Sequence, residues 1–188
     1  ILGKVSKELW AEYRTFEPEL SEQGALECRM VGERLTEMGL KIDLMLTSAH
    51  KRAVLSLKNV RDTYRVEPMP PCQVMTQIHE EKGVNMKGQT FPGLSRQKVL
   101  ELCPGLEVPA DQAEILTEQG WYFPEHLETD EELAARAKQC MGLFKEMAKR
   151  EDMAGKTVFA VSHGAFLNCL TWQLVGLNDR QVLTSGAL

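Results

Sequence analysis

The sequence has no long apolar run, no block of like charge and no paired cysteines. Its longest apolar stretches, near residues 157–161 and 165–170, are far shorter than the roughly 20 residues that cross a bilayer. The formal net charge is -5 and the basic residues are scattered, which argues against a nucleic-acid-binding protein. The five cysteines include no Cys-x-x-Cys pair, so we expect reduced, buried thiols and neither disulfides nor a zinc site.

The beginning of the sequence shows no basic segment followed by an apolar one. It therefore predicts a protein that is not secreted, and a cytoplasmic location, or an organelle matrix if a targeting segment has been removed. Apolar residues make up 43% and charged residues 26% of the 188 residues, an ordinary globular balance. Residues 1–188 are predicted to form a single domain, which at this size buries roughly 70% of the surface of the unfolded chain.

The periodicity predicts helices alternating with short strands. Ser21 is the expected N-cap of a helix that ends at Gly39, with an apolar face formed by Leu26, Met30, Leu35 and Met38. Further helices are expected at residues 53–60, 95–103, 129–149 and 165–175, the third opening with a Thr-x-x-Glu capping box. A long irregular segment from residue 105 to 127 is interpreted as a functional loop or lid.

Buried strands are expected at residues 41–47, 72–78 and 156–162. The last is almost entirely apolar, which is typical of a strand buried on both faces in the middle of a parallel sheet. The order of strands and helices predicts an α/β fold, a three-layer sandwich with a mostly parallel central sheet.

Open α/β sheets bind ligands at the carboxyl ends of their strands, so the residues that follow the strands are candidates for one site. Arg52 follows the first strand, Glu80 the second, and His163 and Gly164 the third. A guanidinium binds phosphate oxygens bidentately, and a histidine at a helix N-terminus lies beside amides that also attract an anion. Gly164 lets the backbone approach closely, and a carboxyl group such as that of Glu80 can protonate a leaving alkoxide. The pattern predicts a phosphomonoester site.

Simpler interpretations exist for most of these residues. Arg52 at a helix start is typical of a surface arginine, and Glu81 is as good a candidate as Glu80 in the same charged loop. His163 has no packing reason to follow a buried strand, which favours a function. Because no histidines are paired at ligand spacing, no metal site is predicted. The other three histidines are assigned no functional role: His50, His79 and His126.

Four strings, in the right order, resemble the histidine phosphatase superfamily, which includes the cofactor-dependent phosphoglycerate mutases. Residues 18–24 resemble its PLTxxG segment, and residues 43–56 resemble DxxxxSxxxRAxxT, with Ser56 in place of threonine. Residues 128–136 resemble ESxxxxxxR, and residues 161–164 resemble VSHG. The resemblance implies a phosphoglycerate-mutase-like fold, in which Arg52, His163 and Gly164 lie at the phosphate site.

The middle of the chain is similar to one branch of that superfamily. In that branch a strand ends in His-Glu, a glycine-rich loop follows, and a GLSR…P…GWW stretch comes next; residues 79–83, 92–96 and 120–122 match these features. The alignment favours Glu80 over Glu81 as the proton donor. The resemblance implies a phosphatase acting on a phosphorylated small molecule or a phosphoprotein, with no cofactor, and a true mutase is less consistent with it.

In this family an Arg-His-Gly motif at the end of the first strand supplies the nucleophilic histidine, and no Arg-His-Gly occurs in the sequence. We expect the motif just upstream of Ile1, because residues 1–17 match the loop that follows it, with Trp10 where that loop often has a tryptophan. The missing strand is next to strand 156–162 in the family, and without it backbone groups of buried strands lack partners.

The absent motif leaves two hypotheses. In the first, an upstream histidine makes the protein a phosphatase that works through a phosphohistidine intermediate. In the second, the protein has lost the nucleophile and serves as a catalytically inactive scaffold or binding subunit, with a protein partner in a larger assembly.

Overall fold

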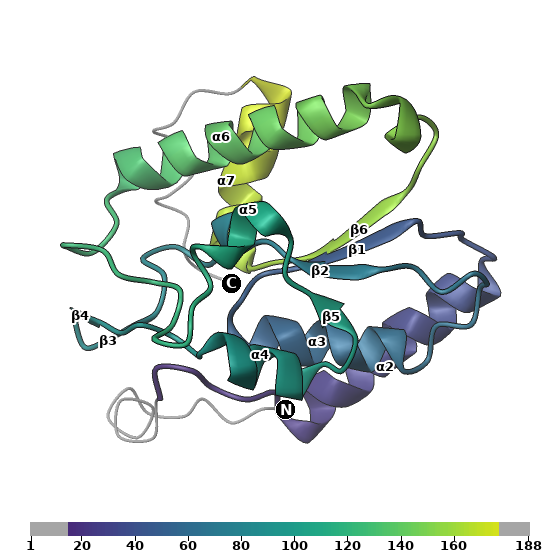
Figure 1. Cartoon of the computed structure of the whole chain (residues 1–188), viewed down its shortest axis with the longest axis horizontal. Helices are drawn as coiled ribbons and strands as arrows, with labels where there is room; N and C mark the ends of the chain where they lie inside the picture. Colours follow the sequence, from purple (N-terminus) through teal and green to yellow (C-terminus); the bar gives the residue numbers. More distant parts are fainter. Residues whose placement is uncertain (1–14, 177–188) are drawn as a thin grey trace, which may run out of the picture.

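A four-stranded parallel sheet lies at the centre of the computed structural model, which describes residues 15–176 (Figure 1). The strand order is β5-β2-β1-β6, and each neighbouring pair is parallel. Thr47, at the end of β1, lies opposite Val74 of β2 and Val161 of β6. The bounds are β1 Leu44–Thr47, β2 Cys72–Val74, β5 Leu106–Glu107 and β6 Val158–Val161. The predicted α/β class with a mostly parallel sheet is confirmed, whereas Trp10 lies outside the described residues.

Helices cover both faces of the sheet. In Figure 1, α2, α3 and α4 lie on one side of it and α6 and α7 on the other. Their bounds are α2 Glu22–Glu37, α3 Lys51–Arg61, α4 Arg96–Leu102, α6 Asp130–Lys149 and α7 Gly164–Val175. The smaller elements are η1 Thr76–Ile78, the hairpin β3 Asn85–Met86 with β4 Gln89–Thr90, α5 Ala110–Ala113 and η2 Glu151–Met153. Each sheet face therefore carries its own apolar core.

The helix starts follow from local sequence. The Ser21 hydroxyl accepts a 3.0 Å hydrogen bond from the Gly24 amide at the start of α2, and Ser95 caps α4 in the same way. Thr129 and Glu132 form a reciprocal capping box at the start of α6. These caps satisfy amides that have no partner inside the helix, which is why short polar side chains mark these boundaries in the sequence.

The apolar face expected for α2 is wrong. Its buried residue is Gly32, where a Cβ atom would lie 2.2 Å from the Val60 carbonyl oxygen of α3. The two helices approach so closely that the Thr63 hydroxyl donates a 2.7 Å hydrogen bond to the Arg29 carbonyl. The close backbone contact therefore determines which face of α2 is buried. Three of the expected apolar side chains point to solvent: Leu26, Met30 and Met38.

Two further expectations are corrected at the second strand. The predicted strand 72–78 ends at Val74 and continues as η1, because the Thr76 amide and hydroxyl both donate to Oε1 of Gln112, each at 2.8 Å. Gln112 belongs to α5, which lies inside the segment expected to be irregular, as does β5. A side-chain amide thus replaces the sheet as the hydrogen-bond partner of this backbone.

Strand β6 is the last strand of the sheet formed by the described residues, whereas its apolar composition predicted a place in the middle. Among residues 15–176 it pairs with β1 alone, and Ala160 is exposed while its neighbours are only half-buried. By contrast, all of β1 is buried.

Candidate active site

Polar side chains from the ends of β1, η1 and β6 meet above the carboxyl edge of the sheet. His50 follows β1, His79 follows η1 and His163 follows β6. The His50 ring lies 4.7 Å from the His163 ring, edge to face, and 5.0 Å from the Trp121 ring. His79 packs 5.6 Å from the same indole. Three imidazoles and an indole therefore form one buried cluster, because parallel strands deliver their following residues to the same edge.

His163 is the N-cap residue of α7 and is 5% exposed. Its Nε2 atom lies 2.9 Å from the Ser48 hydroxyl oxygen, at the end of β1. Burial, followed by the charge effects of His50 and Arg52, lowers the pKa of His163 to about 2. The imidazole is therefore neutral at pH 7, and it can donate or accept a hydrogen bond without adding charge to the site.

Arg52 lies in the first turn of α3 and is half-buried. Its Nη1 atom is 3.5 Å from Nδ1 of His50. The guanidinium is close enough to depress the pKa of both His50 and His163. It is therefore not the solvated surface arginine of the simpler interpretation, and it brings a permanent positive charge to the imidazole cluster.

Glu80 lies in the loop after η1, and its side chain faces the N-terminus of α7. Its Oε1 atom accepts hydrogen bonds from the amides of Phe166, at 3.2 Å, and Glu81, at 3.0 Å. Glu81 contributes its amide to this arrangement, and Gly164, the first residue of α7, is exposed. The sequence-predicted residues thus all lie around the beginnings of α3 and α7.

Arg136 of α6 holds the loop that carries Glu80. It forms a two-point ion pair with Glu128, at 2.7 and 2.8 Å, and both side chains are nearly buried. The same guanidinium donates to the carbonyls of Gln77 and His79, at 2.8 and 2.9 Å, and lies 4.6 Å from the Phe166 ring centre. Arginine suits this place because its planar fork serves several acceptors at once.

Trp121 and Tyr122 form an aromatic wall beside the histidines. The two rings are 5.5 Å apart, and Tyr122 lies 5.2 Å from His79. Glycines make room for them: a Cβ atom at Gly83 would lie 2.1 Å from the Tyr122 ring, and one at Gly93 would lie 2.4 Å from Nε1 of Trp121. Both glycines have positive φ, so the loop needs them for conformation as well as space.

Sequence reasoning missed part of this cluster. His50 and His79 were assigned no role, yet both are buried in contact with the site. A signal was available, because His79 follows directly on a predicted strand and His50 comes three residues after one, which was close to the argument used for His163. Trp121 was noted only as part of residues 120–122, which match the branch pattern, and was assigned no place in the site. His126 does stay apart, exposed and paired with a nearby glutamate.

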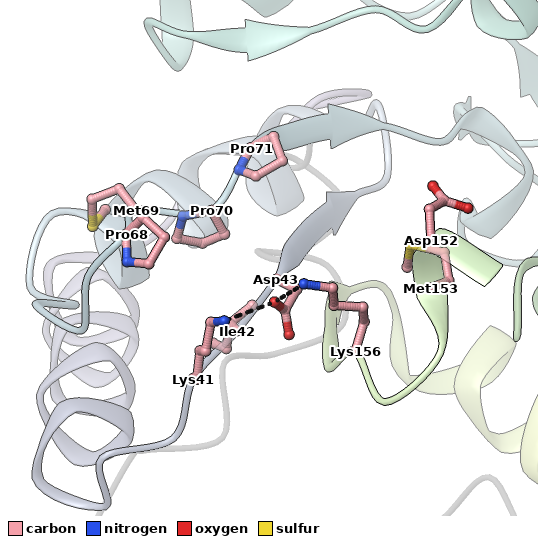
Figure 2. Close-up of a pocket in the computed structure, with 10 residues that line it drawn as sticks. All are labelled: Lys41, Ile42, Asp43, Pro68, Met69, Pro70, Pro71, Asp152, Met153 and Lys156. Carbon is pink, nitrogen blue, oxygen red and sulfur yellow. Dashed lines mark hydrogen bonds and ion pairs between the residues drawn. The ribbon is translucent and has the colours of Figure 1, made fainter. Parts of the chain in front are cut away.

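The opposite end of the sheet has a separate cleft of about 270 Å³, shown in Figure 2. It lies at the amino ends of the strands and includes Lys41 and Lys156, which flank Asp43 at 3.4 and 3.0 Å. These ion pairs, with the backbone amide of Thr157 as the largest influence, lower the pKa of Asp43 to about 2. Because the carboxylate occupies both cations, this cleft is a weaker candidate for an anion than the carboxyl edge.

No group of three or more histidine, cysteine, aspartate or glutamate side chains between residues 15 and 176 could hold a metal ion. Within the same range, every helix is too short or too polar to cross a membrane.

The model of the histidine phosphatase superfamily (branch 1) matches residues 10–184. The chain belongs to this superfamily. A 2,3-bisphosphoglycerate-dependent phosphoglycerate mutase of Nitrosococcus oceani is 27% identical over 177 residues, which cover 88% of this chain and 73% of the mutase.

Solved structures share the fold. The ecdysone phosphate phosphatase of Bombix mori, in complex with tungstate, has a TM-score of 0.61 at 21% identity; the match covers 90% of this chain but only 61% of that one. Bacillus stearothermophilus YhfR has a TM-score of 0.58 at 18% identity, with 95% of this chain and 80% of that one covered. These similarities confirm the phosphoglycerate-mutase-like fold. This chain spans about three fifths of the length of the ecdysone phosphate phosphatase.

Proposed function

We propose that the protein hydrolyses phosphomonoesters through a phosphohistidine intermediate, with the nucleophile supplied by an Arg-His-Gly segment upstream of Ile1. The observation that carries this proposal is the convergence of His163 and Arg52 at the carboxyl edge of the sheet, in a chain of the histidine phosphatase superfamily. A fixed positive charge, neutral imidazole donors and the N-terminus of α7 together suit a tetrahedral oxyanion.

The open edge of β6 is where the missing strand would fit. Among the described residues this edge has no partner strand, and Ala160 is exposed on it. A parallel strand added here would end beside His163, because parallel neighbours share their carboxyl edge. Its backbone would also pair the open groups of β6, so the same segment would complete both the sheet and the site.

The proposed reaction has two balanced steps. The upstream imidazole attacks phosphorus in line, and the bond from phosphorus to the ester oxygen breaks while the carboxyl group of Glu80 gives its proton to that oxygen. Water then attacks phosphorus, the bond from phosphorus to the imidazole nitrogen breaks with its electron pair returning to the nitrogen, Glu80 takes a proton of the water, and inorganic phosphate leaves. Arg52 and His163 stabilise the charge on the equatorial oxygens in both steps. Gly164 leaves room for the anion at the helix start.

The proposed substrate is a phosphorylated small molecule or a phosphoprotein, and phosphatase activity is favoured over mutase activity. The phosphatase with the fold of this chain acts on a phosphate ester and carries tungstate, a phosphate-like oxyanion.

A second function has its own supporting observation, the absence of Arg-His-Gly from all 188 residues. If no such segment exists upstream, we propose a catalytically inactive binding subunit whose partner fills the edge of β6. The mass and N-terminal sequence of the natural protein distinguish the two functions directly, because only the enzyme requires the histidine.

The test of the enzyme uses the natural protein with p-nitrophenyl phosphate. We expect His163→Ala to lower kcat by at least about 100-fold, since it removes a group beside the reacting oxygens, while circular dichroism shows that the variant is still folded. His126→Ala, an exposed histidine outside the cluster, is the matched control and should keep wild-type turnover. Near-normal rates in His163→Ala would refute the assigned role, and failure to trap acid-labile phosphohistidine would refute the intermediate.

A further inference from the structure

Glu17 is a carboxyl group buried beside the site, although the proposed reaction does not use it. It is 8% exposed and precedes α2 in the chain. Its Oε2 atom accepts a 3.0 Å hydrogen bond from the Lys51 amide and lies 3.4 Å from Nδ1 of His50. Its Oε1 atom is buried and has no hydrogen-bond partner among the described residues. A buried acid with an unpartnered oxygen is costly, so its position needs an explanation.

His50 connects Glu17 to Arg52. Its ring is 1% exposed, and Nδ1 faces both Oε2 of Glu17, at 3.4 Å, and Nη1 of Arg52, at 3.5 Å. One ring nitrogen cannot donate and accept a hydrogen bond at the same time. When Nδ1 carries a proton, it donates to the carboxylate; when it does not, it accepts from the guanidinium. The protonation of this pair therefore determines which neighbour holds the His50 ring.

The pair sits where a proton can change hands near neutral pH. Burial raises the pKa of the Glu17 carboxyl to about 7, against the lowering effects of the Lys51 amide and the nearby positive charges. Burial also lowers the pKa of His50 to about 3, so this ring stays neutral. The titratable or charged groups that face the pair come from α3, α6, η1 and α7: Lys51, Arg52, Arg136, His79 and His163.

We propose that Glu17 and His50 are a buried pair that positions Arg52, and that the proton on Glu17 sets how tightly the pocket holds an oxyanion. The inference rests on the proposed function, in which Arg52 binds the phosphoryl group. An ionised Glu17 attracts the guanidinium and repels the anion, whereas a protonated Glu17 does neither. The contact between the neutral His50 ring and the Arg52 guanidinium, at 3.5 Å, is long for a hydrogen bond. The change in the charge of Glu17 therefore affects oxyanion binding more than this contact does. The oxyanion binds more tightly on the acidic side of neutrality.

The experiment measures sulfate binding to the full-length protein by calorimetry between pH 5.5 and 8.5, at constant ionic strength. Sulfate keeps its charge over this range, so the protein alone causes any pH dependence. We expect sulfate to bind about tenfold more weakly at pH 8.5 than at pH 5.5, the effect of a one-unit change in the pKa of one carboxyl group. Glu17→Gln should bind sulfate with the acidic-side affinity at every pH.

Glu19→Gln is the matched control. Glu19 lies two residues after Glu17 in the chain, its side chain is exposed and pairs with Lys51, and the substitution removes the same charge. It should keep the wild-type pH profile. A second readout needs no anion: the ¹⁵N signal of His50 Nδ1 should change between pH 6 and 8 in the wild type and stay constant in Glu17→Gln.

The outcomes separate this inference from the function on which it rests. Sulfate binding with the same pH dependence in the wild type and in Glu17→Gln overturns the role of the pair and leaves the proposed function standing. No sulfate binding at any pH overturns the anion site of the proposed function, and the role of the pair with it. Should Glu17→Gln fail to fold, a His50 signal in the wild type that does not change between pH 6 and 8 overturns the inference.

Discussion

The Gly32→Ala variant tests whether close approach or helix propensity dominates at the contact of α2 with α3. Gly32 lies inside α2, where alanine is normally better than glycine by about 0.5–1 kcal/mol. The new Cβ atom would lie 2.2 Å from the Val60 carbonyl oxygen and 2.3 Å from the Thr63 hydroxyl. The helices must move apart, since the first of these atoms belongs to the backbone.

The expected cost follows from that movement. Overpacking costs about 1–3 kcal/mol, and separation also weakens the 2.7 Å hydrogen bond from Thr63 to the Arg29 carbonyl, which contributes about 0.5–1.5 kcal/mol. Subtracting the propensity gain leaves a net loss of about 0.5–4 kcal/mol in the free energy of unfolding.

Urea unfolding followed by circular dichroism measures this loss. Gly142→Ala is the matched control, because Gly142 lies inside α6 with nothing within 4 Å of the added Cβ atom. We expect this control to gain about 0.5–1 kcal/mol. The reasoning is refuted if Gly32→Ala is as stable as the wild type or more so, because propensity would then outweigh the contact.

Two further predictions concern buried polar groups. Arg136→Lys should lower the free energy of unfolding by about 2–3 kcal/mol, because an ammonium cannot bind Glu128 and the loop carbonyls together. The control Arg150→Lys, in an exposed ion pair, should change it by under about 0.5 kcal/mol. Equal effects of the two variants in urea unfolding would contradict this prediction. The free energy of unfolding should also fall as the pH drops below 6.5, by up to about 1.4 kcal/mol per pH unit for each buried histidine. The reason is that these histidines take up protons in the unfolded chain but stay neutral in the folded chain. Protonation of Glu17, whose pKa is raised to about 7, offsets part of this loss above pH 4.5, and urea titrations with unchanged midpoints from pH 7 to 5 would refute the histidine effect. The three histidines are His50, His79 and His163.

The sequence by itself determined most of the local structure. Ser21, Ser95 and Thr129 each cap a helix as expected, because a cap depends only on residues within one turn. The four family strings lie along one chain in order, so the superfamily and its parallel sheet were also readable. His163 could be singled out because a buried strand, a glycine and an apolar helix surround it in sequence.

Only the tertiary structure decided which residues share the site and which faces are buried. His50, Glu17 and Trp121 belong to one cluster through contacts across 33 residues or more, and no local pattern encodes such contacts. The exposed face of α2 likewise depends on where Gly32 lets α3 approach. A periodic pattern indicates which residues can be buried, but a residue is buried only where another part of the chain packs against it.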